Sequence, residues 1–319
     1  MKRVRNFSDW AYWRLHLANV ELADPCPSDP AELEAWRARV RERLTEFLGP
    51  DPEPVPLDPD FSDSVDCGEY QRERVVFDTE ATMSVPAYLL RPHGEARGAI
   101  LAVHGHGPGK QQICEPTADG YADALARAGF VVLAPDLRGF GERADRTPDD
   151  KYHCDWNLVC ATMAGVVPLA RNVWDLRGAL DLLETVSEAA ADGMGVVGFS
   201  YGATCTLFTA ARDDRVRAAC VSGYLSSWAT AHTVPGNMCG SQVMPGMLGH
   251  IEHADVASLL GPRALFVESG VDDPIFPIDA ARATVTQLGR IGVDVTHREH
   301  AGGHEWSGAG VPEFFAAKL

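Results

Sequence analysis

Short, continuous apolar runs constrain the fold of this chain more than any other feature of its sequence. They recur in the second part of the chain, at residues 98–105, 130–136, 193–200, 215–224 and 263–270. Such runs are typical of strands that are buried on both faces of a parallel sheet. Segments with helical periodicity alternate with them, at residues 119–129, 171–186, 201–213 and 278–292. The sequence therefore predicts an α/β fold, with a mostly parallel central sheet and helices on both of its faces.

The chain divides into two parts of different character. Residues 1–69 are expected to form a helical N-terminal extension and a linker, because a strong helix pattern is followed by the Pro- and Asp-rich stretch 51–63. Residues 70–319 are expected to form the catalytic domain. Within it, long connections near 142–170 and 224–250 are expected to be lid insertions over the active-site edge.

The charge balance excludes two classes of partner. Lys and Arg number 28 and Asp and Glu number 45, so the formal net charge is −17. A chain this acidic repels phosphate backbones and anionic lipid headgroups, so we expect no nucleic-acid partner and no membrane partner. No apolar run has the length of a membrane span, and the N-terminus lacks the apolar region of a signal peptide. With eight cysteines and no Cys-x-x-Cys pair, the sequence is typical of a cytoplasmic protein with reduced thiols.

The strongest motif is Gly-Phe-Ser-Tyr-Gly, at residues 198–202. An expected strand precedes it and an expected helix follows it, which is the setting of a nucleophile elbow. In an elbow the serine occupies a sharp, strained turn, and the two glycines let the strand and the helix approach closely. Ser200 is therefore the candidate nucleophile. Its alternative role is to cap the helix that follows.

A serine hydroxyl needs a neighbouring base, and the chain offers one in the order that hydrolases use. Asp272 and Asp273 follow the last of the apolar runs, and His304 follows the next expected strand after two glycines. The carboxyl ends of parallel strands meet at one edge of the sheet, so these residues can reach Ser200 there. We expect His304 to act as the general base and Asp273 to orient it. Asp272 is the alternative for the orienting carboxylate.

Other residues compete for these roles or suggest different chemistry. His297 and His300 lie within the strand-like run before His304, so packing or surface roles are expected for them. The three histidines lack the cysteine or carboxylate partners of a zinc site, so no metal site is expected. Cys239 is not surrounded by an elbow sequence, and we expect a lid residue there rather than a second nucleophile.

Two backbone N–H groups are candidates for an oxyanion hole. A glycine-rich sequence, HGHGPG, begins at His104 directly after the first parallel strand, where HGGG-like loops donate one N–H group. We expect His106 to supply this donor, with Gly107 as the alternative. Tyr201 follows the nucleophile directly and is expected to supply the second donor.

Large apolar side chains in the expected lids and beside the base are candidates for contact with the substrate. They are Trp156, Trp228, Met238 and Trp306. Such side chains suit a pocket for an acyl group or a ring, and packing within the lid is their alternative role.

Together these motifs resemble the α/β-hydrolase superfamily, and within it the dienelactone hydrolase-like and acetyl xylan esterase-like branch. The resemblance covers roughly residues 70–319 and rests on HGHGPG, APDLRGFGER, CDWNL, VWDLRGALDLL, GFSYG, GNMCGSQ, ESGVDDPIFP and GGHEW. It implies an α/β-hydrolase fold and assigns the catalytic and oxyanion roles to Ser200, Asp273, His304, His106 and Tyr201. Dienelactone hydrolases carry a cysteine at the elbow, so a serine there implies esters other than dienelactone.

The sequence therefore predicts a serine hydrolase that cleaves a small or medium carboxylic ester, such as an acetyl ester, through an acyl-enzyme. We expect it to need no metal and no organic cofactor. Its expected partner is a small-molecule ester, and the N-terminal extension could cover the active-site edge or join copies of the chain into a homo-oligomer. The alternatives are an amidase, a peptidase or an acyl transferase with the same triad, and a non-catalytic binding protein with a hydrolase fold.

Overall fold

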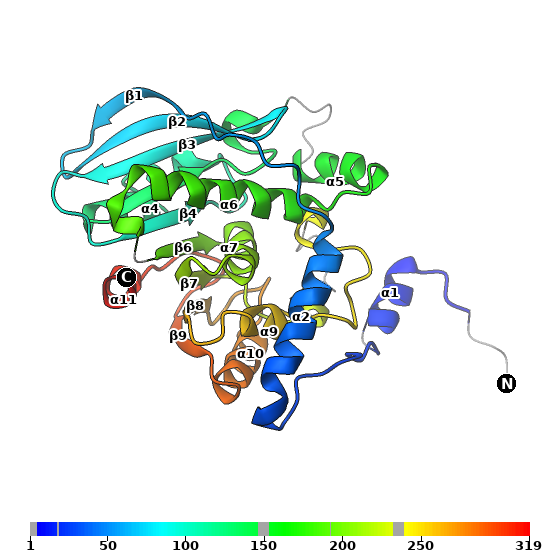
Figure 1. The fold of residues 1–319 in the computed structure, drawn as a ribbon. Coiled ribbons are helices and arrows are strands. Elements are labelled where there is room, and N and C mark those ends of the chain that lie inside the picture. The colour runs from blue at the N-terminus through cyan, green and yellow to red at the C-terminus, as the bar shows by residue number, and fades with distance from the viewer. Residues whose placement is uncertain (1–4, 18, 146–152, 192, 232–238) are drawn as a thin grey trace.

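A single nine-stranded sheet runs through the part of the chain that the computed structural model describes, residues 5–17, 19–145, 153–191, 193–231 and 239–319. The strand order is β1-β2-β3-β5-β4-β6-β7-β8-β9 (Figure 1). The strands are β1 Asp60–Asp66, β2 Tyr70–Glu80, β3 Met83–Pro92, β4 Ala99–Val103, β5 Val131–Pro135, β6 Met194–Phe199, β7 Val216–Ser222, β8 Ala264–Gly270 and β9 Asp294–His300.

Strands β4 to β9 form the parallel part of the sheet, and β1 to β3 add an antiparallel part at one edge. Strands β4, β5 and β8 are buried at every residue, as continuous apolar runs require. The predicted α/β fold with a mostly parallel central sheet is confirmed.

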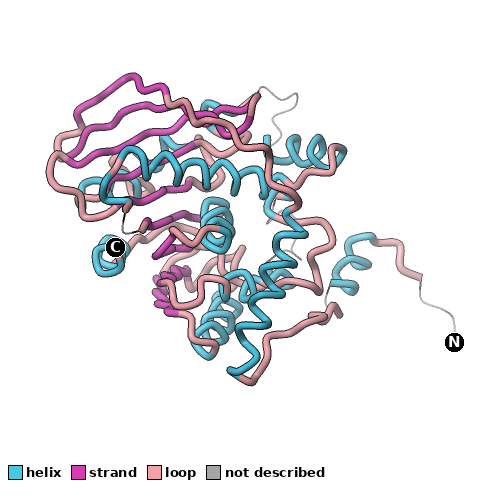
Figure 2. Tube along the Cα trace, in the orientation of Figure 1, coloured by secondary structure: helices cyan, strands magenta, loops and turns pink. Residues whose placement is uncertain are grey.

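Helices cover both faces of the sheet (Figures 1 and 2). The α-helices are α1 Asp9–Leu17, α2 Leu33–Leu48, α3 Lys110–Cys114, α4 Tyr121–Arg127, α5 His153–Met163, α6 Pro168–Val186, α7 Tyr201–Arg212, α8 Trp228–Ala231, α9 His253–Ser258, α10 Ile278–Arg290 and α11 Val311–Lys318. Neighbouring residues of one strand enter different cores. Leu101 belongs to the buried cluster that includes residues of α2, α6 and α7, whereas Ile100 belongs to the cluster that includes residues of α4 and α11. This alternation is what a strand between two helical layers produces.

Helix α2 is part of the main core. Trp36, Val40, Leu44 and Leu48 recur every four residues and are buried in the same cluster as the central strands. This spacing places the four side chains on one face of the helix, and that face packs against α9. The helix ends at Gly49, whose φ of 77° suits a residue without a side chain.

Strand β1 lies where the sequence predicts part of a linker. It pairs with β2 in antiparallel fashion, from Asp60 opposite Val76 to Asp66 opposite Gln71, and its side chains are largely exposed. An edge strand can be held by backbone hydrogen bonds to a single neighbour and needs no apolar alternation. The polar sequence DFSDSVD therefore gives no signal that would predict a strand.

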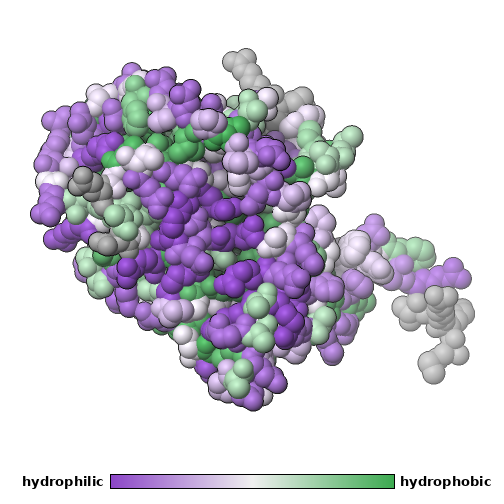
Figure 3. Space-filling view, viewed as in Figure 1, coloured by the Kyte–Doolittle hydropathy of each residue, from purple (hydrophilic) through white to green (hydrophobic). Residues whose placement is uncertain are grey.

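Two helices expose large hydrophobic side chains. Helix α1 has no buried residue, and Trp13 and Leu15 on it are exposed. Val159 and Met163 of α5 are also exposed, and hydrophobic surface is visible at that edge of the molecule in Figure 3. None of the described helices combines the length and the hydrophobicity that crossing a membrane requires.

Replacing Trp36 with alanine is expected to lower the free energy of unfolding by about 3–5 kcal/mol, because it leaves a cavity in the core. Urea unfolding followed by circular dichroism measures this change. Leu15→Ala on α1 is the control: its side chain is 66% exposed, so its effect should stay within about 0.5 kcal/mol. Identical unfolding curves for wild type and Trp36→Ala would contradict the packing of α2 into the main core.

Candidate active site

Ser200 lies in a sharp turn between β6 and α7, with backbone angles φ 54° and ψ −120°. A positive φ is rare for a residue with a side chain, and it marks the strained turn of a nucleophile elbow. Two glycines make room for the turn. A β-carbon at Gly198 would lie 2.4 Å from the carbonyl of Gly202, and one at Gly202 would lie 2.0 Å from the carbonyl oxygen of Val103.

His304 connects Ser200 to Asp273 through hydrogen bonds. Its Nε2 lies 2.9 Å from Ser200 Oγ, and its Nδ1 lies 2.8 Å from Asp273 Oδ2. With the proton on Nδ1, the ring donates to the carboxylate, and Nε2 can accept the serine proton. The structure thus brings together the three residues that the sequence indicates as candidate nucleophile, base and orienting carboxylate.

Asp273, rather than Asp272, contacts His304. Asp273 is buried, and its Oδ1 accepts hydrogen bonds from the backbone N–H groups of Ile275 (2.7 Å) and Phe276 (3.0 Å). These bonds fix the carboxylate and leave Oδ2 for the imidazole. Asp272 is exposed to solvent. The two residues are adjacent, so only the course of the turn decides which carboxylate faces inward.

Two aromatic rings pack against the imidazole of His304. The ring centroid of Phe199 is 4.8 Å away, and that of Phe276 is 5.6 Å away. Both rings lie at shallow angles to the imidazole, 33° and 32°. These contacts restrict the rotation of the ring and so keep its nitrogens directed at Ser200 and Asp273.

Glu268 supports the loop that carries His304, and the sequence motifs did not single it out. It is fully buried on β8, where Oε1 accepts from Ser222 Oγ (2.8 Å) and Ser307 N (3.0 Å) and Oε2 accepts from Gly308 N (2.8 Å). The sequence feature that could have identified Glu268 is a carboxylate within an otherwise apolar strand sequence. A buried charge of this kind needs several hydrogen-bond donors.

The competing histidines lie on β9. His297 Nε2 is 3.1 Å from Ser269 Oγ, and burial lowers the pKa of His297. Among the described residues, no hydrogen bond joins His297 or His300 to Ser200. Their packing and surface roles agree with the expectation from the strand pattern.

The glycine-rich loop after β4 lies directly beside the nucleophile. A β-carbon at Gly105 would be 3.3 Å from Ser200 Cβ. The loop is fixed by His104, whose Nδ1 donates to Gly105 O (2.7 Å) and whose Nε2 accepts from Leu137 N (3.0 Å). Burial lowers the pKa of His104, which favours the neutral ring that this pair of hydrogen bonds requires.

The two residues expected to form the oxyanion hole lie next to each other. The ring of His106 stacks on the ring of Tyr201, with centroids 5.0 Å apart. Tyr201 is the first residue of α7, and the first N–H groups of a helix have no acceptor within the helix. Its hydroxyl accepts a hydrogen bond from Asn172 Nδ2 (2.8 Å), which fixes the side chain.

Buried ion pairs hold the loop after β5. Asp136 is buried and accepts hydrogen bonds from the backbone N–H groups of Lys110 (2.7 Å) and Glu142 (2.9 Å). The Lys110 ammonium also lies 2.5 Å from the Asp136 carboxylate. Arg138 pairs with Asp175, at 2.8 Å. Breaking a buried pair of this kind leaves an uncompensated charge, so both pairs specify the loop geometry.

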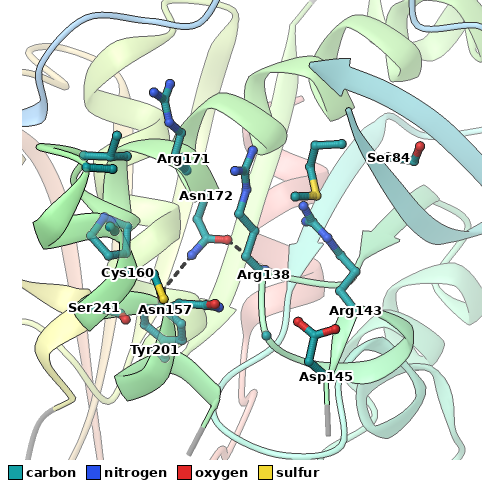
Figure 4. A pocket seen from close by; sticks show the side chains of 16 residues that line it. Ser84, Arg138, Arg143, Asp145, Asn157, Cys160, Arg171, Asn172, Tyr201 and Ser241 are labelled. Carbon is teal, nitrogen blue, oxygen red and sulfur yellow. Dashed lines mark hydrogen bonds between the residues drawn. The ribbon is translucent and has the colours of Figure 1, made fainter. Parts of the chain in front are cut away.

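A cavity of about 500 Å³ opens beside this site (Figure 4). Tyr201, which follows the nucleophile, is one of its lining residues, but Ser200 and His304 are not among them. Cys160 and Ala161 of α5 are among its apolar lining residues. The polar members include Arg138, Arg143, Asp145, Asn157, Arg171 and Asn172.

The three tryptophans expected to contact substrate do not line this cavity. Trp228 is buried in the core, 4.1 Å from the ring of His253, and Trp306 packs against Tyr121 at 4.6 Å. Trp156 is 52% exposed on α5. Met238 lies outside the described residues. Sequence indicates that these side chains are large and apolar, but only tertiary packing decides what they contact.

His106 also belongs to a cluster of one imidazole and two thiols. The side chains of His106, Cys154 and Cys239 place their nitrogen and sulfur atoms within 4.8 Å of one another. A hydrogen bond from Cys154 and the neighbouring His106 lower the pKa of Cys239 to about 5, although burial opposes the shift. The three residues are far apart in the sequence, so no local spacing motif reveals the cluster.

Comparison with known proteins agrees with this description. Residues 85–232 match the model of the dienelactone hydrolase family. The "Putative hydrolase YtaP" of Bacillus subtilis (strain 168) is 27% identical over 259 residues, which cover 76% of this chain and 83% of that protein.

Two solved structures show the same fold. One is titled a "putative acetyl xylan esterase" from Bacteroides fragilis, with a TM-score of 0.74, 19% identity, and coverage of 93% of this chain and 83% of that one. The other is acetyl xylan esterase 1 from Thermoanaerobacterium sp., with a TM-score of 0.62, 17% identity, and coverage of 96% and 98%. The chain therefore shares the fold of these esterases, and its residues 85–232 resemble the dienelactone hydrolase family.

Proposed function

We propose that this hydrolase cleaves a carboxylic ester through an acyl-enzyme formed on Ser200. The observation that carries the proposal is the chain of hydrogen bonds from Ser200 through His304 to Asp273, at a strained strand-to-helix turn. A serine hydroxyl becomes nucleophilic when a base accepts its proton as it attacks. The 2.9 Å contact with His304 Nε2 places such a base within hydrogen-bond reach.

In the first half of the reaction, Ser200 Oγ attacks the ester carbonyl while His304 Nε2 takes its proton. The imidazolium that forms is stabilised by the Asp273 carboxylate, 2.8 Å from Nδ1. The tetrahedral intermediate collapses when His304 returns the proton to the leaving alkoxide. The alcohol leaves, and the acyl group remains on Ser200.

The negative charge on the carbonyl oxygen needs donors that are already in place. The N–H group of Tyr201, at the start of α7, and that of His106, next to Gly105 in the adjacent loop, are the proposed pair. Loss of one such donor in comparable enzymes costs about 2.7–4 kcal/mol of transition-state stabilisation. In the second half of the reaction, His304 activates a water molecule, which releases the acid.

The polar lining of the cavity favours a substrate with a short acyl group and a hydrophilic alcohol. Arg143, Asp145 and Asn157 interrupt its apolar surface, and burying a long alkyl chain against them would leave polar groups without partners. The names of the similar structures, which include acetyl xylan esterases, suggest an acetylated sugar. The substrate proposed here is therefore a small acetyl ester.

Ser200→Ala is expected to lower kcat/KM for p-nitrophenyl acetate by at least about 10³-fold, because the acyl-enzyme can no longer form. Initial rates from released p-nitrophenol measure the loss. Ser64→Ala, on the exposed edge strand β1, is the matched control and should retain wild-type turnover. Ester turnover that survives in folded Ser200→Ala protein would show that another residue is the nucleophile.

Asp273→Asn is expected to reduce kcat by about 10⁴-fold, because an amide favours the wrong tautomer of His304. The neighbouring substitution Asp272→Asn provides an internal control, since that carboxylate is exposed. It should leave kcat within a factor of about two. The assignment fails if the two variants lose activity equally, or if only Asp272→Asn does.

Acyl-chain length tests the proposed substrate class. We expect p-nitrophenyl acetate to be cleaved with a kcat/KM at least about tenfold above that of the octanoate ester. A preference for octanoate would indicate an apolar acyl channel instead. Comparable turnover of p-nitroacetanilide would favour an amidase.

A further inference from the structure

We propose that His106, Cys154 and Cys239 form a binding site for a zinc ion. This site is separate from the proposed ester chemistry, in which the two cysteines and the imidazole of His106 take no part. Two thiolates and one imidazole are a ligand set that zinc prefers, and three protein ligands leave a fourth position for water. The three candidate ligand atoms lie within 4.8 Å of one another.

The separations of the ligand atoms fit a tetrahedral ion. With Zn–S near 2.3 Å and Zn–N near 2.0–2.1 Å, a tetrahedral site places sulfur and nitrogen about 3.5 Å apart and two sulfurs about 3.8 Å apart. Cys154 Sγ lies 3.6 Å from His106 Nε2. A metal ion can therefore contact both atoms with little movement, and a small shift of a side chain brings the third ligand to bonding distance.

The site joins three segments that are remote in sequence. His106 lies in the loop after β4, Cys154 lies in the first turn of α5, and Cys239 directly precedes the short 3₁₀ helix η5, Gly240–Gln242. Ser241 Oγ donates to the carbonyl oxygen of Cys154 at 2.6 Å, so α5 and η5 are already held together without the ion. A ligand set that is preorganised in this way loses little conformational entropy when metal binds.

Residues around the ligands orient them. Gln242 Nε2 donates to Cys239 Sγ at 3.8 Å, while its Oε1 accepts from Thr204 Oγ1 of α7 at 2.7 Å. The ring of His106 stacks on Tyr201. In metal sites, the residues that coordinate the ion are typically oriented by such hydrogen bonds and packing contacts with their neighbours.

The position of the site suggests what the ion does. Tyr201 and Ser241 line the cavity, and they contact His106 and Cys154 respectively. An ion held by the three ligands would connect α5 and η5, at the cavity, to the loop beside Ser200. We assign it the role of fixing the cavity wall against that loop.

The experiment uses untagged, reduced protein, loaded with Zn²⁺ and freed of excess metal by gel filtration. Metal analysis should give about one zinc per chain for the wild type. Cys239→Ser and Cys154→Ser should each bind zinc at least about tenfold more weakly. Cys160→Ser is the matched control, because it makes the same exchange on the same helix, α5, outside the cluster. It should retain the wild-type stoichiometry.

Two further measurements keep the test decisive if a variant does not fold. Cobalt-loaded wild type should show a thiolate-to-cobalt charge-transfer band and the visible bands of a tetrahedral ion. Zinc should also protect Cys154 and Cys239 from alkylation, as read by peptide mapping.

Wild type that retains no more zinc than Cys239→Ser overturns the proposal. So does a Cys154–Cys239 disulfide in protein that binds no metal, since the pair would then be a redox dithiol. Ester turnover is measured separately with Ser200→Ala, so failure of the metal site and failure of the proposed function are distinguishable.

Discussion

The strained turn at Ser200 is the constraint on which the rest of the site depends. Its positive φ directs the side chain out of the sheet, and it requires β6, α7 and the end of β4 to approach more closely than β-carbons would allow at Gly198 and Gly202. The closeness of β4 also brings the glycine-rich loop against the nucleophile. The buried parallel strands supply the rigid frame that tolerates this strain.

Buried polar groups hold the remaining parts of the site in position. Glu268 accepts three hydrogen bonds and ties the segment after His304 to β8, while Asp273 is fixed by two backbone N–H groups of its own turn. The pair between Asp136 and Lys110 fixes the loop after β5. Each carboxylate is supplied with several donors, which offset the cost of its burial. The catalytic geometry therefore depends on charged residues that do not react.

The sheet, its helices and the grouping of Ser200, His304 and Asp273 could be predicted because their signals are local. Apolar runs identify buried strands, and GxSxG carries the requirement for a strained turn in five residues. Features that depend on tertiary contacts could not be predicted. Strand β1 pairs through its backbone alone, Trp228 fills the core rather than a substrate pocket, and His106 meets Cys154 and Cys239 only after folding. Which of Asp272 and Asp273 contacts His304 depends on the backbone path of a single turn, and the sequence does not reveal that path.

Labelling with a fluorophosphonate tests the proposed activation of Ser200 most directly, because this reagent reacts with a serine only when a base activates it. Mass spectrometry of the intact protein and of its peptides would locate the adduct. We expect one adduct per chain, on Ser200, and a much slower reaction in a folded His304→Ala variant. A folded wild-type protein that remains unlabelled, or that carries the adduct on another residue, would contradict the assignment of Ser200 as the nucleophile.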